Sequence, residues 1–86
     1  MWKIELSKRA LQDSKKAQKS LYKEKIEELL KVLKDNPFQN YPPFEKLEPP
    51  KDNVYSRKIN KQHRIVYHVN NECKLITILS MWTHYE

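Results

Sequence analysis

Apolar and polar residues alternate over residues 2–6, which is typical of a half-buried strand. Ser7 follows, and its hydroxyl suits the N-cap of a helix. A weak apolar stripe then recurs at helical spacing, and it consists of Ala10, Ser14, Ala17 and Leu21. The pattern predicts a short first strand and then a first helix that buries this stripe.

A stronger apolar face follows, and it consists of Tyr22, Ile26, Leu29, Leu30 and Leu33. Spacings of three and four residues put these side chains on one side of an amphipathic helix. Asn36 stands before Pro37, and proline disfavours helical geometry in the residue that precedes it. The pattern therefore predicts a second helix that ends near Asn36.

A long irregular stretch over residues 37–53 holds all five prolines of the chain. A loop of this length is uncommon in so short a domain, and such loops often carry function. A stiff surface connection is the alternative explanation, and the pattern alone does not choose between the two.

The rest of the chain is typical of strands. Three candidates follow one another at residues 54–59, 64–69 and 73–82. The third is almost continuously apolar, which favours an interior position in a sheet. Short turns make consecutive strands antiparallel neighbours. We predict one domain over residues 1–86 with the order β-α-α-β-β-β. This is an α+β fold with two N-terminal helices packed on one face of a twisted antiparallel sheet.

The chain of 86 residues contains no glycine, whereas average usage would give about six. A P-loop and a dinucleotide-binding GxGxxG turn both need glycine where backbone amides approach phosphate. Both kinds of phosphate-binding loop are therefore excluded. Asparagine tolerates left-handed backbone geometry, so we expect it to make turns in place of glycine, for example at Asn53.

The single cysteine, Cys73, cannot form a disulfide within the chain, so a disulfide-stabilised secreted scaffold is excluded. Its apolar neighbours in the sequence predict a buried, unreactive thiol. No apolar stretch approaches the ~20 residues that span a bilayer, and no signal-peptide core follows Met1. We expect a cytoplasmic protein with no membrane partner.

The formal net charge is +6, and the first third of the chain carries most of it. Residues 1–34 hold ten Lys and Arg against five Asp and Glu. A basic surface of this kind favours a polyanion such as RNA, or an acidic protein. A solvated helix face has the same composition, and charge alone does not separate these explanations.

The three histidines, His63, His68 and His84, lack the spacing of metal ligands, and we predict neither a metal site nor a cofactor. Acid–base chemistry on RNA remains, which requires a base for the 2′-OH, a cation at phosphorus and an acid for the leaving oxygen. Residues of suitable type are Glu45, Glu48, Arg57, Lys58, Arg64, His84 and Tyr85. Each of them also has an ordinary explanation as a surface charge or a cap.

The last residues, 82–86, have the sequence WTHYE, which is rich in aromatic side chains for a chain terminus. Aromatic packing over the edge of the sheet is one explanation. The other is a ring that stacks on an RNA base beside a general acid, because aromatic faces commonly hold single-stranded RNA.

Residues 55–67 (YSRKINKQHRIVY) and 81–85 (MWTHY) together resemble the YoeB/Txe toxins of the RelE/ParE superfamily. Residues 36–38 (NPF) and 43–47 (PFEKL) fit the same pattern. The resemblance covers nearly the whole chain and is weakest over residues 1–35. It implies a RelE-like fold, related to microbial ribonucleases. It also implies a type II toxin that cuts messenger RNA in the ribosomal A site and so inhibits translation.

The resemblance also implies roles for single residues. Glu45 stands at the position of the general base, and Arg64 at that of the arginine that stabilises the phosphate. His84 stands at the position of the histidine proposed as general acid, and Tyr85 at that of the terminal catalytic tyrosine. The implied reaction is metal-independent.

Arg57 and Lys58 occupy a basic pair that the resemblance assigns to RNA phosphate and that usually consists of two arginines. Lys58 keeps the charge but loses the bidentate fork of arginine. Lys15, Lys16 and Lys19 are expected to contact ribosomal RNA, because gripping one codon does not require the basic excess of the first third.

The implied partners are a cognate YefM/Axe-type antitoxin and the 70S ribosome with its messenger RNA. Operator DNA would be reached only through the antitoxin complex, and a homodimer is allowed. Two other functions stay open at this point. One is a catalytically inactive RNA- or protein-binding module of the same fold. The other is a toxin of the superfamily with a target other than the ribosome.

Overall fold

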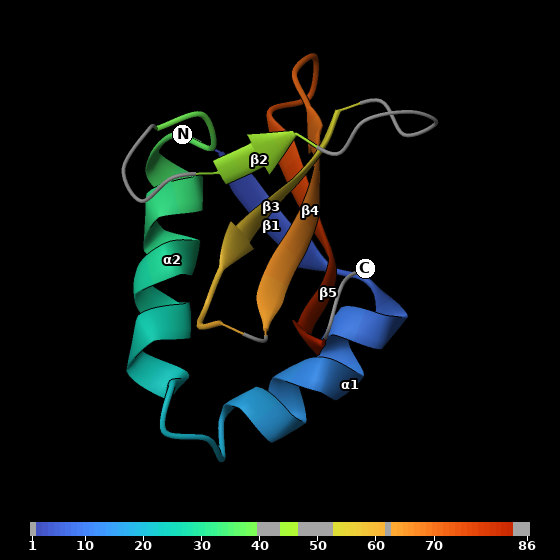
Figure 1. Ribbon diagram of the computed structural model, residues 1–86. Coiled ribbons are helices and arrows are strands. Elements are labelled where there is room, and N and C mark those ends of the chain that lie inside the picture. The colour runs from blue at the N-terminus through green and yellow to red at the C-terminus, as the bar shows by residue number, and fades with distance from the viewer. Residues whose placement is uncertain (1, 40–43, 47–52, 62, 84–86) are drawn as a thin grey trace.

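The computed structural model describes residues 2–39, 44–46, 53–61 and 63–83 (Figure 1). Its elements in chain order are β1 (Lys3–Leu6), α1 (Lys8–Ala17), α2 (Lys23–Asp35), β2 (Phe44–Lys46), β3 (Val54–Lys58), β4 (Arg64–Asn70) and β5 (Leu75–Thr83). The predicted α+β class is confirmed. The three-residue strand β2 is an addition, because it lies in the stretch that we expected to be irregular.

The five strands of the described part of the chain form one sheet in the order β1-β5-β4-β3-β2. β4 pairs antiparallel with β3 and β5, and β3 pairs antiparallel with β2. β1 pairs in parallel with β5, so the sheet is mixed and not antiparallel throughout. Short turns impose antiparallel pairing only on strands that they connect directly. The rest of the chain connects β1 to β5, and this long connection permits a parallel pair.

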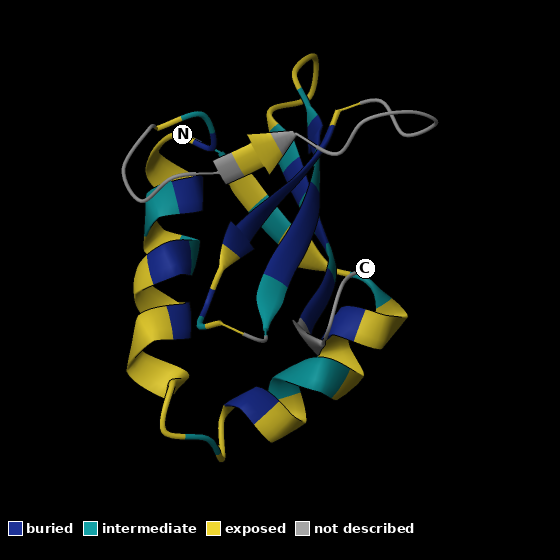
Figure 2. Cartoon of the chain, viewed as in Figure 1, coloured by how far each residue is buried: buried dark blue, intermediate teal, exposed yellow. Residues whose placement is uncertain are grey.

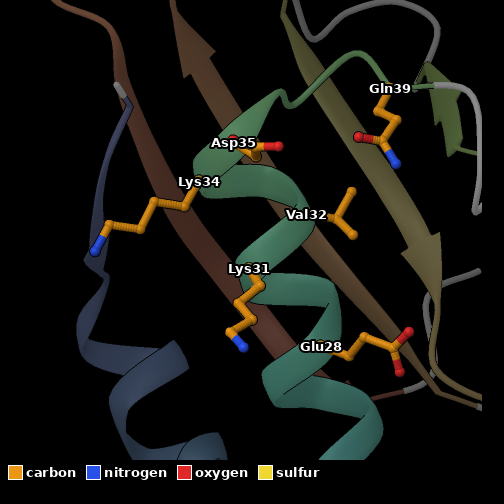
Figure 3. A pocket seen from close by; sticks show the side chains of 6 residues that line it. All are labelled: Glu28, Lys31, Val32, Lys34, Asp35 and Gln39. Carbon is orange, nitrogen blue, oxygen red and sulfur yellow. The ribbon is translucent and has the colours of Figure 1, made fainter.

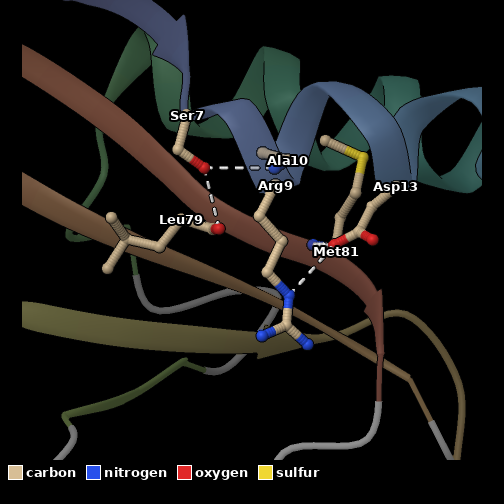
Figure 4. Close-up of polar contacts among 6 residues, drawn as sticks. All are labelled: Ser7, Arg9, Ala10, Asp13, Leu79 and Met81. Carbon is tan, nitrogen blue, oxygen red and sulfur yellow. Dashed lines mark hydrogen bonds and ion pairs between the residues drawn. The ribbon is translucent and has the colours of Figure 1, made fainter.

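Polar contacts at the start of α1 fix this helix on the interior strand β5 (Figure 4). Ser7 is the N-cap, as predicted, and its Oγ accepts a hydrogen bond from the Ala10 N–H at 3.1 Å. The same hydroxyl donates to the Leu79 carbonyl at 2.9 Å. One turn further along, Asp13 Oδ2 accepts a hydrogen bond from the Met81 N–H at 3.1 Å. The cap therefore also serves as an attachment between helix and sheet.

The core lies between the helices and one face of the sheet, and Figure 2 shows buried residues on the helix sides that face the strands. α2 contributes Ile26, Leu29 and Leu33, as the predicted apolar face requires, while Leu30 is only partly buried. α2 ends at Asp35, close to the predicted boundary. Among the described residues, no helix is long and apolar enough to cross a membrane.

The apolar stripe predicted for the first helix is buried only in part. Ala10 and Ala17 are buried, but the prediction is wrong for Leu21, which is 99% exposed. α1 ends at Ala17, so Leu21 lies in the connection to α2, where helical spacing no longer decides which side chains face the core. Tyr22, the N-cap of α2, is also exposed.

The turn between β4 and β5 corrects the prediction for Cys73. We expected a buried thiol, but β5 begins only at Leu75, and Cys73 is exposed. The Asn70 Oδ1 accepts hydrogen bonds from the N–H groups of Glu72 at 3.0 Å and of Cys73 at 3.1 Å. The asparagine side chain thereby closes a turn before the apolar run of β5 begins.

Among the residues that the structure describes, two adopt the left-handed backbone geometry for which glycine is ordinarily used. They are Asn53, with φ 59°, and Lys74, with φ 53°. Asn53 confirms the expectation that asparagine makes turns in a chain without glycine. Lysine has no comparable tolerance, and nothing in the sequence pointed to Lys74.

Candidate functional site

The strand register separates two faces of the sheet. Tyr55 on β3 and Ile65 and Tyr67 on β4 belong to the core beneath the helices. Side chains alternate along a strand, so Ser56 and Lys58 lie on the opposite face. Ser56 is the Cα partner of Glu45 on β2, and Lys58 is the Cα partner of Arg64 on β4. Opposite residues of an antiparallel pair share a face, so the register brings Glu45, Ser56, Lys58 and Arg64 together on the face away from the helices.

The centre of this face is an ion pair between Arg64 and Glu45. Arg64 Nη1 donates to Glu45 Oε2 at 3.0 Å, and it also lies 3.5 Å from Ser56 Oγ. The Glu45 side chain is 62% exposed and that of Arg64 is 26% exposed, so solvent reaches both. A guanidinium group carries five N–H donors, so a contact through one nitrogen is compatible with a phosphate bound by others. The arrangement presents a carboxylate beside a cation that fits phosphate.

The start of β4 lies between the ends of two other strands. Arg64 is the Cα partner of Lys58 at the end of β3 and of Thr83 at the end of β5. Lys58 is exposed and adds a second positive charge at this end of the sheet. The predicted site residues His84 and Tyr85 lie outside the described residues. The chain therefore reaches the neighbourhood of Arg64 at the residue just before His84.

Ser56 is a member of this group that sequence reasoning did not select. Ser56 is only 1% exposed, and its hydroxyl lies between β2 and β4, close to the Arg64 guanidinium. The alternation of β3 carries a signal for it, because Ser56 and Lys58 are polar and lie on the face opposite Tyr55 and Ile59. A small polar residue in the middle of a strand leaves room for a longer side chain to cross it.

The structure corrects the prediction for Arg57, which was expected to bind RNA phosphate. The residue is 1% exposed and lies on the helix side of β3. Its Nε donates to the Tyr67 hydroxyl at 3.2 Å, and its Nη2 donates to the carbonyl oxygens of Pro37 at 3.1 Å and Gln39 at 2.8 Å. Buried charges require such hydrogen-bond acceptors, and here the acceptors belong to the protein. The guanidinium group is thus turned into the core and away from the Glu45 face.

Tyr67 is the other polar group of this interior cluster. Burial raises the pKa of its phenol above the ordinary value, although the nearby Arg57 guanidinium acts in the opposite direction. The phenol is therefore neutral at physiological pH and serves as both acceptor and donor. It accepts the hydrogen bond of Arg57 and donates one to the Pro37 carbonyl at 3.3 Å.

Lys15, Lys16 and Lys19 lie in a different part of the molecule from the Glu45 face. The first two stand in the last turn of α1, the third follows the helix, and all are exposed. Figure 1 shows α1 and β2 at opposite ends of the fold. These lysines therefore lie away from β2, although α1 is attached to β5 at Met81, close to the point where Thr83 pairs with Arg64.

A hollow of about 640 Å³ lies along α2, away from this pair (Figure 3). It is lined by Glu28, Lys31, Val32, Lys34, Asp35 and Gln39. Two lysines and two carboxylates line it, which gives no preference for an anionic ligand. Within the described part of the chain, no group of three or more His, Cys, Asp and Glu side chains is placed to hold a metal ion.

Comparisons with known proteins give matches over nearly the whole chain. Residues 7–85 match the family described as the YoeB-like toxin of bacterial type II toxin–antitoxin systems. The YoeB dimer structure from Staphylococcus aureus is 36% identical, with a TM-score of 0.82 and 98% of each chain covered. The YoeB–YefM complex from the same organism gives 35% identity, a TM-score of 0.80 and 99% coverage of each chain.

A YoeB/ParE toxin from Agrobacterium tumefaciens is 26% identical, with a TM-score of 0.86, and the match covers 96% of this chain and 99% of that one. The Escherichia coli DinJ–YafQ complex, at 22% identity and a TM-score of 0.81, shows a likeness of fold alone. No curated protein sequence matches the chain significantly.

Proposed function

This chain belongs to the family of YoeB-like toxins of bacterial type II toxin–antitoxin systems, and we propose that it is an endoribonuclease that cleaves messenger RNA in the ribosomal A site. The observation that carries the proposal is the solvent-accessible Glu45–Arg64 pair, 3.0 Å apart, on the sheet face opposite the helices. A carboxylate and a guanidinium side by side are what 2′-OH activation and phosphate stabilisation require.

In the proposed reaction, the Glu45 carboxylate takes the proton of a 2′-OH, and the 2′ oxygen attacks the adjacent phosphorus. The bond from phosphorus to the 5′ oxygen breaks, and the leaving oxygen receives a proton. The products are a 2′,3′-cyclic phosphate, or the 3′-phosphate formed from it by water, and a 5′-hydroxyl. Arg64 stabilises the negative charge that develops on the phosphate oxygens, and Lys58 adds a second cation nearby.

His84 is proposed to protonate the leaving oxygen, and Tyr85 to complete the site as the terminal tyrosine. The resemblance of residues 81–85 to the family is the first support for these roles. The pairing of Thr83 with Arg64 is the second, because it brings β5 to Arg64 directly before His84. A histidinium suits this task, since imidazole is the side chain that most readily gains and loses a proton near physiological pH.

We further propose that a cognate YefM-type antitoxin neutralises the chain and that the ribosome supplies the substrate. The Staphylococcus aureus relative, which is 35% identical over 99% of this chain, forms a YoeB–YefM complex. The exposed lysines Lys15, Lys16 and Lys19 would contribute to ribosome binding through phosphate contacts. Inhibition of translation would follow from the loss of intact message.

Sequencing of RNA ends after brief expression tests this function. New ends within coding regions, in register with codons and absent when a translation inhibitor keeps ribosomes off the message, support a ribosome-dependent nuclease. Ends that persist unchanged under the inhibitor would indicate cleavage of free RNA. The variant H84A serves as the catalytic control, and a chain that arrests growth equally with H84A would act as a binding module and not as an enzyme.

A further inference from the structure

Arg57 has a buried position that the proposed reaction does not use. Its residue is 1% exposed, on the side of β3 that faces the helices. Arginine is almost never fully buried unless its charge is compensated. We propose that Arg57 is a positioning residue that holds β2, and with it Glu45, in register with Arg64. This inference rests on the catalytic role proposed above for Glu45.

The Arg57 side chain holds the segment that follows α2. Its Nη2 donates to the carbonyl oxygens of both Pro37 and Gln39, at 3.1 and 2.8 Å. The Pro37 carbonyl also accepts a hydrogen bond from the Tyr67 hydroxyl at 3.3 Å, and Tyr67 in turn accepts one from Arg57 Nε. One guanidinium group and one phenol thus fix the backbone at the point where the chain leaves α2 for β2.

Arg57 also lies opposite Phe44, the residue at which β2 begins. In the β2–β3 ladder, Phe44 is the Cα partner of Arg57, and Glu45 comes next on β2. The connection from Gln39 to Phe44 therefore begins at the side chain of Arg57 and ends beside its backbone. Fixing the start of a connection lowers the entropic cost of pairing its end. The hydrogen bonds of Arg57 and Tyr67 to the backbone of Pro37 and Gln39 form a clamp, and this clamp therefore favours the β2–β3 ladder that carries Glu45.

An aromatic cluster supports the clamp from the side. Phe38 lies in sequence between the two residues whose carbonyls accept from Arg57. Its ring packs edge-on against the rings of Tyr55 and Trp2, with centroid distances of 5.5 and 6.2 Å. Tyr55 stacks on Tyr67 at 5.9 Å. Edge-to-face and stacked aromatic contacts of this kind are favourable beyond the burial of the rings alone. The hydrogen bonds of the clamp are therefore flanked by packed aromatic rings.

The position of Glu45 needs such support. β2 has three residues and lies at the edge of the sheet, where pairing on one side only makes a short strand marginal. The Glu45 side chain is 62% exposed, so packing does little to hold it. General-base catalysis depends on placement, and a displacement of about 1 Å in an active site can cost roughly 100-fold in rate.

Lysine cannot replace arginine in this clamp. A lysine ammonium keeps the charge, but it is a compact group without the planar fork that reaches a phenol on one side and two carbonyls on the other. The informative variant is therefore R57K, with Y67F as a milder second variant that removes only the shared hydroxyl. K61M is the matched control, since Lys61 is an exposed residue of the turn after β3.

The first measurement is steady-state cleavage of messenger RNA on programmed ribosomes. R57K should lower kcat by about 10- to 100-fold while KM for the ribosome stays close to that of the wild type, because ribosome contacts are unaffected. Y67F should lower kcat less, and K61M should leave it unchanged. Equal kcat for R57K and the wild type would overturn the inference.

The second measurement separates positioning from general stability by combining R57K with E45Q. If Arg57 acts through Glu45, R57K should cause little further loss once the carboxylate is gone. A loss of the same fold-size in both backgrounds would mean that Arg57 affects the fold as a whole, and it would overturn the inference.

The third measurement does not depend on activity. Amide hydrogen exchange of β2 should be faster in R57K than in K61M and the wild type, while exchange in β4 and β5 should be unchanged. Unchanged exchange in β2 would overturn the inference even if the chain cleaves RNA. A wild-type chain that cleaves no RNA would instead overturn the proposed function, and exchange would still show whether Arg57 holds β2.

Discussion

Arg64 Nη1 and Glu45 Oε2 lie 3.0 Å apart although their residues are 19 positions apart in the chain and belong to strands that are not neighbours. β3 lies between β4 and β2, and its residue Ser56 is small enough for the Arg64 side chain to pass across it. The pair exists because the sheet order places both strands on either side of a serine. This relationship underlies the proposed reaction, and the predictions below start from it.

The variant E45Q should remove the proposed base without unfolding the protein. We expect cleavage on programmed ribosomes to fall by about 10²- to 10⁴-fold, the usual contribution of general acid–base catalysis. The free energy of unfolding should change by less than about 1 kcal/mol, because the Glu45 side chain is 62% exposed and solvent weakens its ion pair. Single-turnover kinetics and thermal denaturation measure the two effects. Cleavage within a factor of about two of the wild type would exclude Glu45 as the base.

Charge reversal of Lys15, Lys16 and Lys19 to Glu should weaken ribosome binding and its dependence on salt. If all three contact phosphate, the slope of log affinity against log salt should become shallower by about 2–3. Binding at several salt concentrations gives the slope. The matched control reverses three exposed lysines elsewhere, namely Lys31, Lys61 and Lys74. An equal change in the control would assign the effect to net charge and not to the end of α1.

Leu33 and Leu21 provide a matched test of the core. Leu33 is fully buried on α2, so L33A should lower the free energy of unfolding by about 2–5 kcal/mol. Leu21 is 99% exposed, so L21A should change it by no more than about 0.5 kcal/mol. Chemical denaturation of the two variants measures the difference. Similar losses for both would contradict the described end of α1 and the exposure of Leu21.

Tyr67 should make the fold sensitive to alkali. Burial raises the pKa of this phenol above its ordinary value of 10.0, so the folded state retains the proton at a pH where the unfolded chain loses it. Stability from this group is complete below about pH 10 and falls as the pH rises above that value, because the unfolded state then binds fewer protons. Y67F should be less stable than the wild type at neutral pH but should lose less on going to alkaline pH.

Thermal denaturation from pH 7 to 11 measures this difference. The comparison with Y67F cancels the titration of lysines and of the other tyrosines, which both proteins share. Parallel stability curves for the two proteins would contradict the buried, proton-retaining phenol.

The elements with a regular apolar pattern were predictable from the sequence. The face of α2, the cap at Ser7 and the long strands β4 and β5 all follow from local spacing and residue type. β2 was not predicted because three residues offer no periodicity, and their strand geometry depends on pairing with β3. The parallel pairing of β1 with β5 was missed because it depends on contact between the first and last strands of the chain, which local spacing does not reveal.

The candidate site was predictable only through the likeness to a family. Residue types alone suggested Glu45 and Arg64 but did not separate them from surface charges, because their contact depends on the order of the strands. Arg57 shows the opposite error. It stands two residues from both Tyr55 and Ile59, so strand alternation puts it on their core face, but its charge and the family pattern suggested a phosphate contact. The pattern of burial was the better guide there.

The most direct test of the proposed reaction uses messenger RNA with a single 2′-deoxy nucleotide at the cleavage position, bound in the A site of programmed ribosomes. Attack by the 2′ oxygen requires that hydroxyl, whereas attack by water does not. The account predicts that the all-ribose message is cut to a 2′,3′-cyclic phosphate or 3′-phosphate end, and that the 2′-deoxy message stays intact. Cleavage of the 2′-deoxy message at an undiminished rate, or a 3′-hydroxyl end on the ribose message, would contradict it.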